Sequence, residues 1–376
     1  MRTLILSALV LAPTLLGCAE TATEDGGADL AGQDDKGDAV PGIEVQARLR
    51  PTAAVDAVLT AAVPRPGYVF YAAEGTKVTL EVTHGGSDAG LDTKLVVYGP
   101  RLADGTYPKT VATDDDAGYG KLSKVKDLAI SIPGFYLVEL TTGASAMPLT
   151  APAKARLQIR CTGVCDSDQP VSPLGLDLRW YQRSAERRAL SLQAFAMAGA
   201  QVEARKAAGG LPASWGVVMD IDETTLDNSP YQHSRAELGT GYSPGSWTAW
   251  VNQKAAKPVD GALAFTRKVQ ALGGKIAFVT NRMDGTECPQ TQQNLTALGF
   301  AWDQMICKTT TSDKNPRFDQ VKLSMEVVAF VGDNILDFPM QSQDLRKQPE
   351  SAFAAFGDKY FIIPNPMYGS FEKNLD

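Results

Sequence analysis

Two aspartates separated by one residue follow a short apolar segment in the middle of the chain. Asp220 and Asp222 come directly after the run WGVVM at 215–219. An apolar run that ends abruptly in polar residues is typical of a buried strand of a parallel sheet, and ligands bind beyond the carboxyl ends of such strands. Residues i and i+2 of an extended strand point the same way. The pair therefore suits a reaction in which one carboxylate attacks and the other transfers protons.

An Asp-x-Asp pair alone also fits a solvated turn, but more polar residues follow in order. They lie at the ends of the apolar runs 275–279 and 327–331 or in the basic segment between them: Thr280, Asn281, Arg282, Lys314, Arg317, Asp333 and Asp337. Together they offer a hydroxyl, a lysine and a second acidic pair beside a nucleophilic carboxylate. Mg²⁺-assisted phosphoryl transfer requires such groups.

These stretches resemble the haloacid dehalogenase superfamily, and within it the class C bacterial acid phosphatases. The matching segments are DIDETTLDNSPY, TNR, SDKNPRF, VGDNILDF, the upstream WYQRSAERRALSLQAF and the late PNPMYGSFE. Thr225 stands where the family usually has Val or Met, and Ile335 stands where it usually has Leu. The resemblance covers roughly 176–376. It implies an α/β fold, a Rossmann-like parallel sheet with a small cap at about 232–262.

The resemblance also implies a role for each site residue. Asp220 is expected to attack phosphorus and Asp222 to serve as general acid and base. Mg²⁺ is expected on three hard oxygen ligands, from Asp220, the backbone carbonyl of Asp222 and Asp333. The remaining expected roles are phosphoryl binding by Thr280, Asn281 and Lys314, support of the metal site by Asp337, and a structural role for Arg317.

The substrate expected from the resemblance is a small phosphomonoester. The family stacks a substrate ring on the aromatic residue that Trp247 matches, and Tyr368 follows another apolar run. Two facing rings would favour a nucleoside monophosphate, because stacking accepts any flat base. The alternative is that both rings pack against protein and that any small phosphate ester is accepted. For Trp250 a core position is expected.

The N-terminus has the form of a secretory lipoprotein signal. Residues 1–17 combine Arg2, a short apolar run and Leu-Leu-Gly before Cys18, which resembles a bacterial lipobox. Cys18 is then the lipidated first residue, although simple secretion is the alternative. The stretch 18–42 is acidic and poor in large apolar residues, as in a disordered tether. Its reach of roughly 25 Å would hold a domain clear of a membrane surface.

Residues 43–165 change character. Short segments rich in β-branched and aromatic residues alternate with Gly, Pro and Asp turns, which predicts an all-β sandwich. FYAAEGTKVTLEV, LDTKLVVYG and ATDDDAGYGKLSKV resemble bacterial pre-peptidase C-terminal domains, which are accessory domains of secreted enzymes. The aspartates 114–116 offer oxygen ligands for Ca²⁺, but a solvated hairpin turn is favoured. A glycan-binding role of the sandwich is a further hypothesis.

A linker at 166–175 precedes a long amphipathic helix at 179–208, which Gly209 and Gly210 end.

Lipidation of Cys18 leaves four of the five cysteines, an even number suited to an oxidising compartment. Of the three possible pairings we favour Cys161–Cys165 with Cys288–Cys307, because the last two are expected at the same edge of the sheet. Free structural thiols are the alternative.

Composition narrows the function further. The formal charge of −7 argues against a nucleic-acid polymer as partner, because phosphate backbones need basic surfaces. The chain has only two histidines, which argues against histidine phosphatases, His-rich zinc sites and most Ser-His-Asp hydrolases.

Two other hypotheses compete with a phosphomonoesterase. One is a non-catalytic family descendant, which the presence of Asp220 disfavours; the other is a sandwich that is the principal functional unit.

Overall fold

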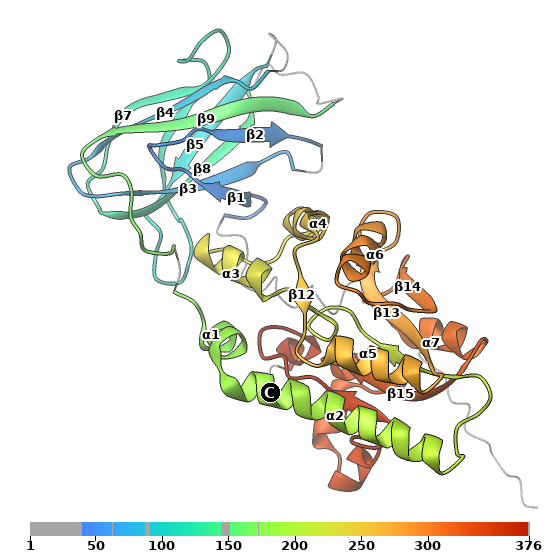
Figure 1. Ribbon diagram of the computed structural model, residues 1–376. Helices are drawn as coiled ribbons and strands as arrows, with labels where there is room; N and C mark the ends of the chain where they lie inside the picture. Colours follow the sequence, from blue (N-terminus) through green and yellow to red (C-terminus); the bar gives the residue numbers. More distant parts are fainter. Residues whose placement is uncertain (1–39, 62, 87–90, 144–150, 172, 375–376) are drawn as a thin grey trace, which may run out of the picture.

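The computed structural model describes residues 40–374 apart from 62, 87–90, 144–150 and 172. The predicted signal segment, Cys18 and most of the predicted tether therefore lie outside the described residues. The described chain forms a β-sandwich and then an α/β region built on a second sheet (Figure 1). None of the helices in this part of the chain combines the length and apolarity that a membrane span needs.

The first region is a sandwich of two sheets, as its sequence predicts. One sheet has the order β1 (Glu44–Arg48), β3 (Pro66–Ala72), β8 (Gly134–Thr142), β5 (Thr93–Tyr98) and β6 (Thr110–Asp114). The other has the order β2 (Val55–Leu59), β9 (Ala153–Thr162), β4 (Lys77–His84) and β7 (Lys124–Ala129). Alternate residues of β4, namely Val78, Leu80 and Val82, are buried between the sheets, which is the pattern of a strand with one solvated face.

The aspartates at 114–116 lie at the end of β6. The Oδ1 atom of Asp114 accepts hydrogen bonds from the backbone nitrogens of Ala117, at 3.1 Å, and Lys124, at 2.6 Å. A short polar side chain that bonds to backbone groups further along the chain is the usual device of a tight turn. This geometry agrees with the turn interpretation, and Ca²⁺ binding stays a prediction.

The helix predicted at 179–208 is divided in two. α1 (Leu176–Arg183) and α2 (Ala185–Ala207) meet at Ser184, whose backbone is extended. The Ser184 hydroxyl accepts a hydrogen bond from the backbone nitrogen of Arg187 at 3.0 Å. Serine is among the best N-cap residues because it satisfies a backbone donor at the helix start. The prediction of one uninterrupted helix was wrong because it overlooked this cap.

The second region is organised around a parallel sheet. Its order is β14 (Gln304–Lys308), β13 (Lys275–Met283), β10 (Trp215–Met219), β15 (Glu326–Gly332) and β16 (Tyr360–Ile362). Helices α2, α5 (Ala262–Ala271) and α6 (Cys288–Ala297) pack on one face and α7 (Asn315–Lys322) on the other. Both faces of β10 are therefore buried, and the Rossmann-like α/β fold predicted from the sequence is confirmed.

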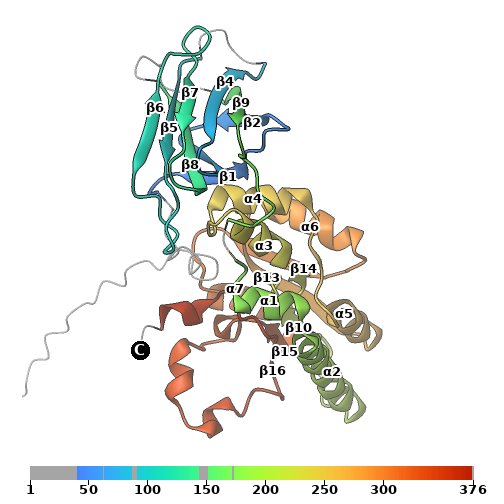
Figure 2. The same cartoon turned by 90° about the vertical axis from the view of Figure 1, so that its left-hand side faces the viewer.

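Two helices and a short pair of antiparallel strands lie between this sheet and the sandwich. They are α3 (Ser229–Glu237), α4 (Pro244–Gln253) and the pair β11 (Leu226–Asp227) and β12 (Lys257–Pro258). We call α3 and α4 the cap. Both views place the cap directly beside strand β1 of the sandwich (Figures 1 and 2). After β15 the chain continues through 3₁₀ helices η2 (Ile335–Asp337), η3 (Gln343–Lys347) and η4 (Glu350–Phe353), and η5 (Ser370–Lys373) follows β16.

Both favoured disulfides are present, Cys161–Cys165 and Cys288–Cys307. The first closes the end of β9. The second joins the start of α6 to β14, so the two cysteines lie at one edge of the parallel sheet, as expected. This pairing is confirmed.

Candidate active site

The carboxyl ends of the central strands form a small cavity. It is lined by residues that follow β10, residues of the β13 end, residues after β15 and one aromatic residue: Asp220, Asp222, Asn281, Asp333, Asn334, Asp337 and Tyr368. The cavity lies at the sheet edge where ligands of open α/β folds bind. The structure thus brings together residues that are up to about 150 positions apart in the chain.

Lys314 links two of these carboxylates. Its Nζ atom lies 2.5 Å from Oδ1 of Asp220 and 2.5 Å from Oδ1 of Asp337, and all three residues are buried. Burial raises the pKa of Asp220 to about 8, with the nearby Asp337 and Asp222 acting in the same direction and Lys314 opposing them. The lysine therefore holds the nucleophile candidate in place and offsets part of its negative charge.

Three carboxylates are arranged so that a metal ion could bind between them. Oxygen atoms of Asp220, Asp333 and Asp337 all lie within 4.8 Å of one another. Asp333 is oriented by Thr224 Oγ1, at 2.9 Å, and by Asn365 Nδ2, at 2.9 Å. Burial, together with the other two carboxylates, raises the pKa of Asp333 well above its usual range. Hard carboxylate oxygens fit Mg²⁺, so the donor set agrees with the predicted ion.

Asp222 also lines the cavity but is not one of the three clustered carboxylates. Its Oδ1 atom accepts from Nε and Nη2 of Arg282, at 3.0 and 2.8 Å, and from Nδ2 of Asn228, at 2.9 Å. Arg282 is almost fully buried and also donates to Oδ1 of Asn228 at 3.1 Å. Three donors on one oxygen fix the orientation of the carboxyl group and leave Oδ2 for a reacting atom. No role was predicted for Asn228, and none for Arg282 beyond its place among the polar residues that follow the run 275–279.

Glu223 is a second buried carboxyl group beside Asp222. It has a φ of +57°, which few residues other than glycine adopt. Its side chain accepts from the backbone nitrogen of Asn228 at 2.8 Å and from the hydroxyl of Tyr368. Burial, with the charges of Asp222 and Asp227 added, raises the pKa of Glu223 well above its usual range. The residue connects the loop after β10 to the segment after β16.

Of the residues predicted to bind the phosphoryl group, Asn281 lines the cavity, whereas Thr280 and Lys314 are not among its lining residues. Lys314 bonds to Asp220, which does line the cavity. Thr280 is fully buried, and its hydroxyl accepts from the backbone nitrogen of Arg282 at 3.1 Å. Arg317 donates to the backbone oxygen of Thr280 and to Oδ1 of Asn281, the latter at 2.6 Å. Arg317 therefore positions this segment from behind, in agreement with the expected structural role.

Of the two tryptophans of the cap, Trp247 is not where it was expected, whereas Trp250 packs as expected. Trp247 is 1 % exposed, packs against Tyr231 and Val251 inside the cap, and does not line the cavity. Its ring therefore has no free face for a substrate, which contradicts the predicted stacking role. Trp250 packs against the apolar core of the α/β region, as expected, and also donates from Nε1 to Oδ1 of Asn228 at 2.9 Å. It therefore belongs to the hydrogen-bond network around Asp222.

Tyr368 does line the cavity, and also a wider cleft next to it. The ring is 4 % exposed and its hydroxyl is bonded to Glu223. The cleft has a volume of about 410 Å³ and shares Asp333, Asn334 and Tyr368 with the cavity. A group bound to a phosphate in the cavity would therefore have room on this side.

A family of known proteins matches the part of the chain that contains this site. The sequence profile of a family described as HAD superfamily, subfamily IIIB (acid phosphatase), matches residues 168–371, more than half of the chain. The chain belongs to this family. The match includes every residue of the cavity and the cap but not the sandwich.

Individual relatives match part of the chain. Acid phosphatase 1 of Solanum lycopersicum is 27 % identical over 160 residues, which are 40 % of this chain and 57 % of that relative. The chain thus spans little more than half the length of this curated relative. The class C acid phosphatase of Bacillus anthracis is 30 % identical, with a TM-score of 0.48, over 52 % of this chain and 85 % of that one.

The sandwich has a structural match of its own. The pre-peptidase C-terminal domain of a Bacillus anthracis collagenase is 11 % identical, with a TM-score of 0.22, over 31 % of this chain and 94 % of that one. A TM-score this low carries no argument, so the resemblance of the sandwich to pre-peptidase C-terminal domains stays a prediction.

Proposed function

We propose that this protein is a metal-dependent phosphomonoesterase that acts through an aspartyl-phosphate. The observation that carries the proposal is the placement of Asp220 beside Lys314 and within 4.8 Å of the carboxylates of Asp333 and Asp337. A carboxylate beside a buried cation and a divalent-ion site is suited to attack phosphorus. Family membership supports the same chemistry.

In the first step a carboxylate oxygen of Asp220 attacks phosphorus, and the bond from phosphorus to the ester oxygen breaks. Asp222 gives a proton to the departing alcohol. In the second step Asp222 takes a proton from water, the water oxygen attacks phosphorus, and the bond to Asp220 breaks to release phosphate. Arg282 and Asn228 hold the Asp222 carboxyl group during both transfers.

Asp220, Asp333 and the backbone carbonyl of Asp222 would hold Mg²⁺, with Asp337 close by. When bound, the ion would offset negative charge on the transferring phosphoryl group. Lys314 supplies a fixed positive charge for the same purpose, and Asn281 borders the space that the phosphoryl oxygens would occupy.

The substrate is a monoester whose alcohol part extends into the cleft beside Tyr368. A volume of about 410 Å³ accommodates an organic group as large as a nucleoside, so a nucleoside monophosphate is one candidate. Because Trp247 is buried, the base would contact Tyr368 alone and not two facing rings. We further propose that the protein acts in the cell envelope or outside the cell, on the basis of residues 1–18.

Phosphate release tests the proposal. The purified protein is assayed with a nucleoside monophosphate, glycerol phosphate and nitrophenyl phosphate, with Mg²⁺ and after treatment with a chelator. Activity that is lost with the chelator and restored by Mg²⁺ is expected for all substrates that are turned over. Equal release with and without the ion would overturn the metal-dependent mechanism.

A further inference from the structure

The sandwich and the cap share a continuous interface. Val45 of strand β1 and the preceding Ile43 belong to an apolar cluster that also contains Val171 of the linker and Leu238 at the end of α3. Arg235 of α3 is buried and donates from Nη1 to the backbone oxygen of Val45 at 2.9 Å. A buried arginine and a shared apolar cluster are features of a fixed contact, because both become costly when exposed.

A second contact lies at the start of α4. The Ser243 hydroxyl, which caps this helix by accepting from the backbone nitrogen of Ser246, donates to Oε1 of Glu44 at 2.6 Å. The Glu44 carboxylate thereby faces the N-terminal end of α4, where a negative charge is favourable. The packing is close enough that a Cβ atom on Gly245 would come within 2.9 Å of Oε1 of Glu44.

The same helix holds both donors of the Asp222 carboxyl group. Trp250 of α4 donates to Asn228 at 2.9 Å, and the guanidinium of Arg282 lies over the ring of Trp247, also of α4, at 5.4 Å. Asn228 and Arg282 are the residues that fix Oδ1 of Asp222. A short chain of contacts therefore runs from Glu44 in the sandwich, through α4, to the proposed general acid.

We propose that the β-sandwich positions the cap and, through α4, the Asp222 carboxyl group, with Glu44 as the positioning residue. This inference rests on the proposed function in one respect, namely the role of Asp222 in proton transfer. The sandwich is then part of the catalytic unit, not an appendage that moves independently of it.

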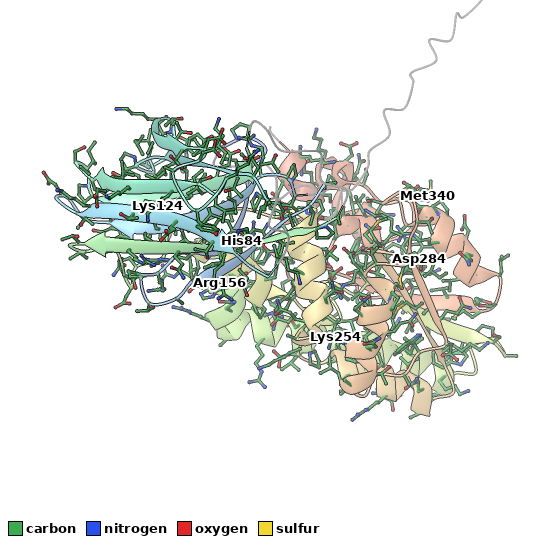
Figure 3. All side chains as sticks on the ribbon, turned by 90° about the horizontal axis from the view of Figure 1, so that it is seen from above. His84, Lys124, Arg156, Lys254, Asp284 and Met340 are labelled. Atoms are coloured by element: carbon green, nitrogen blue, oxygen red, sulfur yellow. A yellow bond between two sulfur atoms is a disulfide. The ribbon has the colours of Figure 1, made fainter. Side chains whose placement is uncertain are left out.

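The test compares Glu44→Ala with Glu81→Ala in the full-length protein. Glu81 is the matched control because its carboxylate also accepts a hydrogen bond, from Lys124 Nζ at 2.9 Å, but entirely within the sandwich. Figure 3 shows Lys124 well apart from the yellow cap helices.

The first measurement does not depend on activity. Hydrogen exchange of the α4 amides is expected to be about tenfold faster in Glu44→Ala than in wild type, because loss of one hydrogen bond to a charged group is of that size. The amides of α5 should not change, and Glu81→Ala should match wild type. Unchanged exchange in α4 would overturn the proposal.

The second measurement is the ratio of kcat/KM for an alkyl phosphate to that for nitrophenyl phosphate. A misplaced general acid matters more for the poor alkoxide leaving group, so the ratio is expected to fall by roughly three- to tenfold in Glu44→Ala. Faster exchange with an unchanged ratio would show that the sandwich holds α4 without positioning Asp222, and would overturn that part of the proposal. If wild type hydrolyses neither ester, the proposed function fails, whereas the exchange result still decides whether the sandwich holds the cap.

Discussion

Among the site carboxylates, Asp222 alone is held by an arginine and an asparagine and stands apart from the carboxylate cluster. We expect Asp222→Asn to reduce kcat on alkyl phosphates by about 10² to 10⁴, because the departing alkoxide then receives no proton. Nitrophenyl phosphate needs little protonation to leave and should lose much less. Initial rates on both substrates test this role, and equal losses would contradict it.

The carboxylates of the proposed metal site predict an effect of pH on stability. The pKa of Asp220 is raised to about 8 and that of Asp333 is raised well above its usual range. The folded state therefore binds more protons than the unfolded state above pH 4, so these groups make the metal-free protein less stable as the pH rises towards 8. Mg²⁺ removes this repulsion and competes with protons for the same oxygens.

We accordingly expect Mg²⁺ to raise Tm more at pH 8 than at pH 5. Thermal unfolding at both pH values, with and without the ion, measures the difference. Asp333→Asn is the matched variant, in which the effect of Mg²⁺ should be reduced at both values. A larger effect at pH 5 would mean that these carboxyl groups do not bind the ion as proposed.

Residues at the ends of strands could be predicted from the sequence, whereas their supporting partners could not. Asp220, Asn281 and Asp333 were placed at one sheet edge because parallel strands all end there. Glu223 and Asn365 were missed. The position of Glu223 depends on a left-handed turn, and that of Asn365 on a loop after β16 that returns to Asp333.

At the scale of elements, most of the α/β fold could be predicted from the apolar runs of the sequence. The apolar runs 215–219, 275–279 and 327–331 became adjacent strands because each is buried on both faces. Helices α3 and α4 lie in the stretch where a cap was expected, but Trp247 was assigned the wrong environment. Helical spacing alone does not tell which side of a short helix faces the sheet, so the burial of Trp247 could not be predicted before the packing of α4 was known.

The disulfide Cys288–Cys307 ties α6 to β14 across 19 positions of the chain. Replacing both cysteines by serine is expected to lower the free energy of unfolding by about 3 kcal/mol, since the unfolded chain is no longer constrained. Denaturant unfolding of the variant and of wild type measures this. A change below about 0.5 kcal/mol would indicate that the unfolded chain gains little freedom when this loop is opened.

At the scale of the whole molecule, the sequence predicted two regions but not their contact. Nothing in the residues of β1 alone indicates that Glu44 binds the first turn of α4, because that pairing joins positions about 200 apart. The contact gives the sandwich a role inside the enzyme. Binding of a glycan by the sandwich stays a prediction.

The position of the protein in the cell depends on Cys18, outside the described residues. If this cysteine is lipidated, Cys18→Ser should move the protein from the membrane fraction to the soluble secreted fraction, or leave an uncleaved precursor. Cell fractionation followed by immunodetection measures the shift. Wild-type protein that is already fully soluble after secretion would show that no lipid anchor is present.

The central claim is that Asp220 forms the covalent intermediate, and Asp220→Asn tests it most directly. Asp227→Asn is the matched control, because Asp227 lies only seven residues further along the chain, in β11, but accepts from the backbone nitrogen of Ser229 at 2.9 Å and does not line the cavity. The measurement is kcat for phosphate release with saturating Mg²⁺. We expect Asp220→Asn to lower kcat by 10³ or more, on the order of other nucleophile removals, while Asp227→Asn stays within about tenfold of wild type. A tenth or more of wild-type turnover in Asp220→Asn would contradict the account.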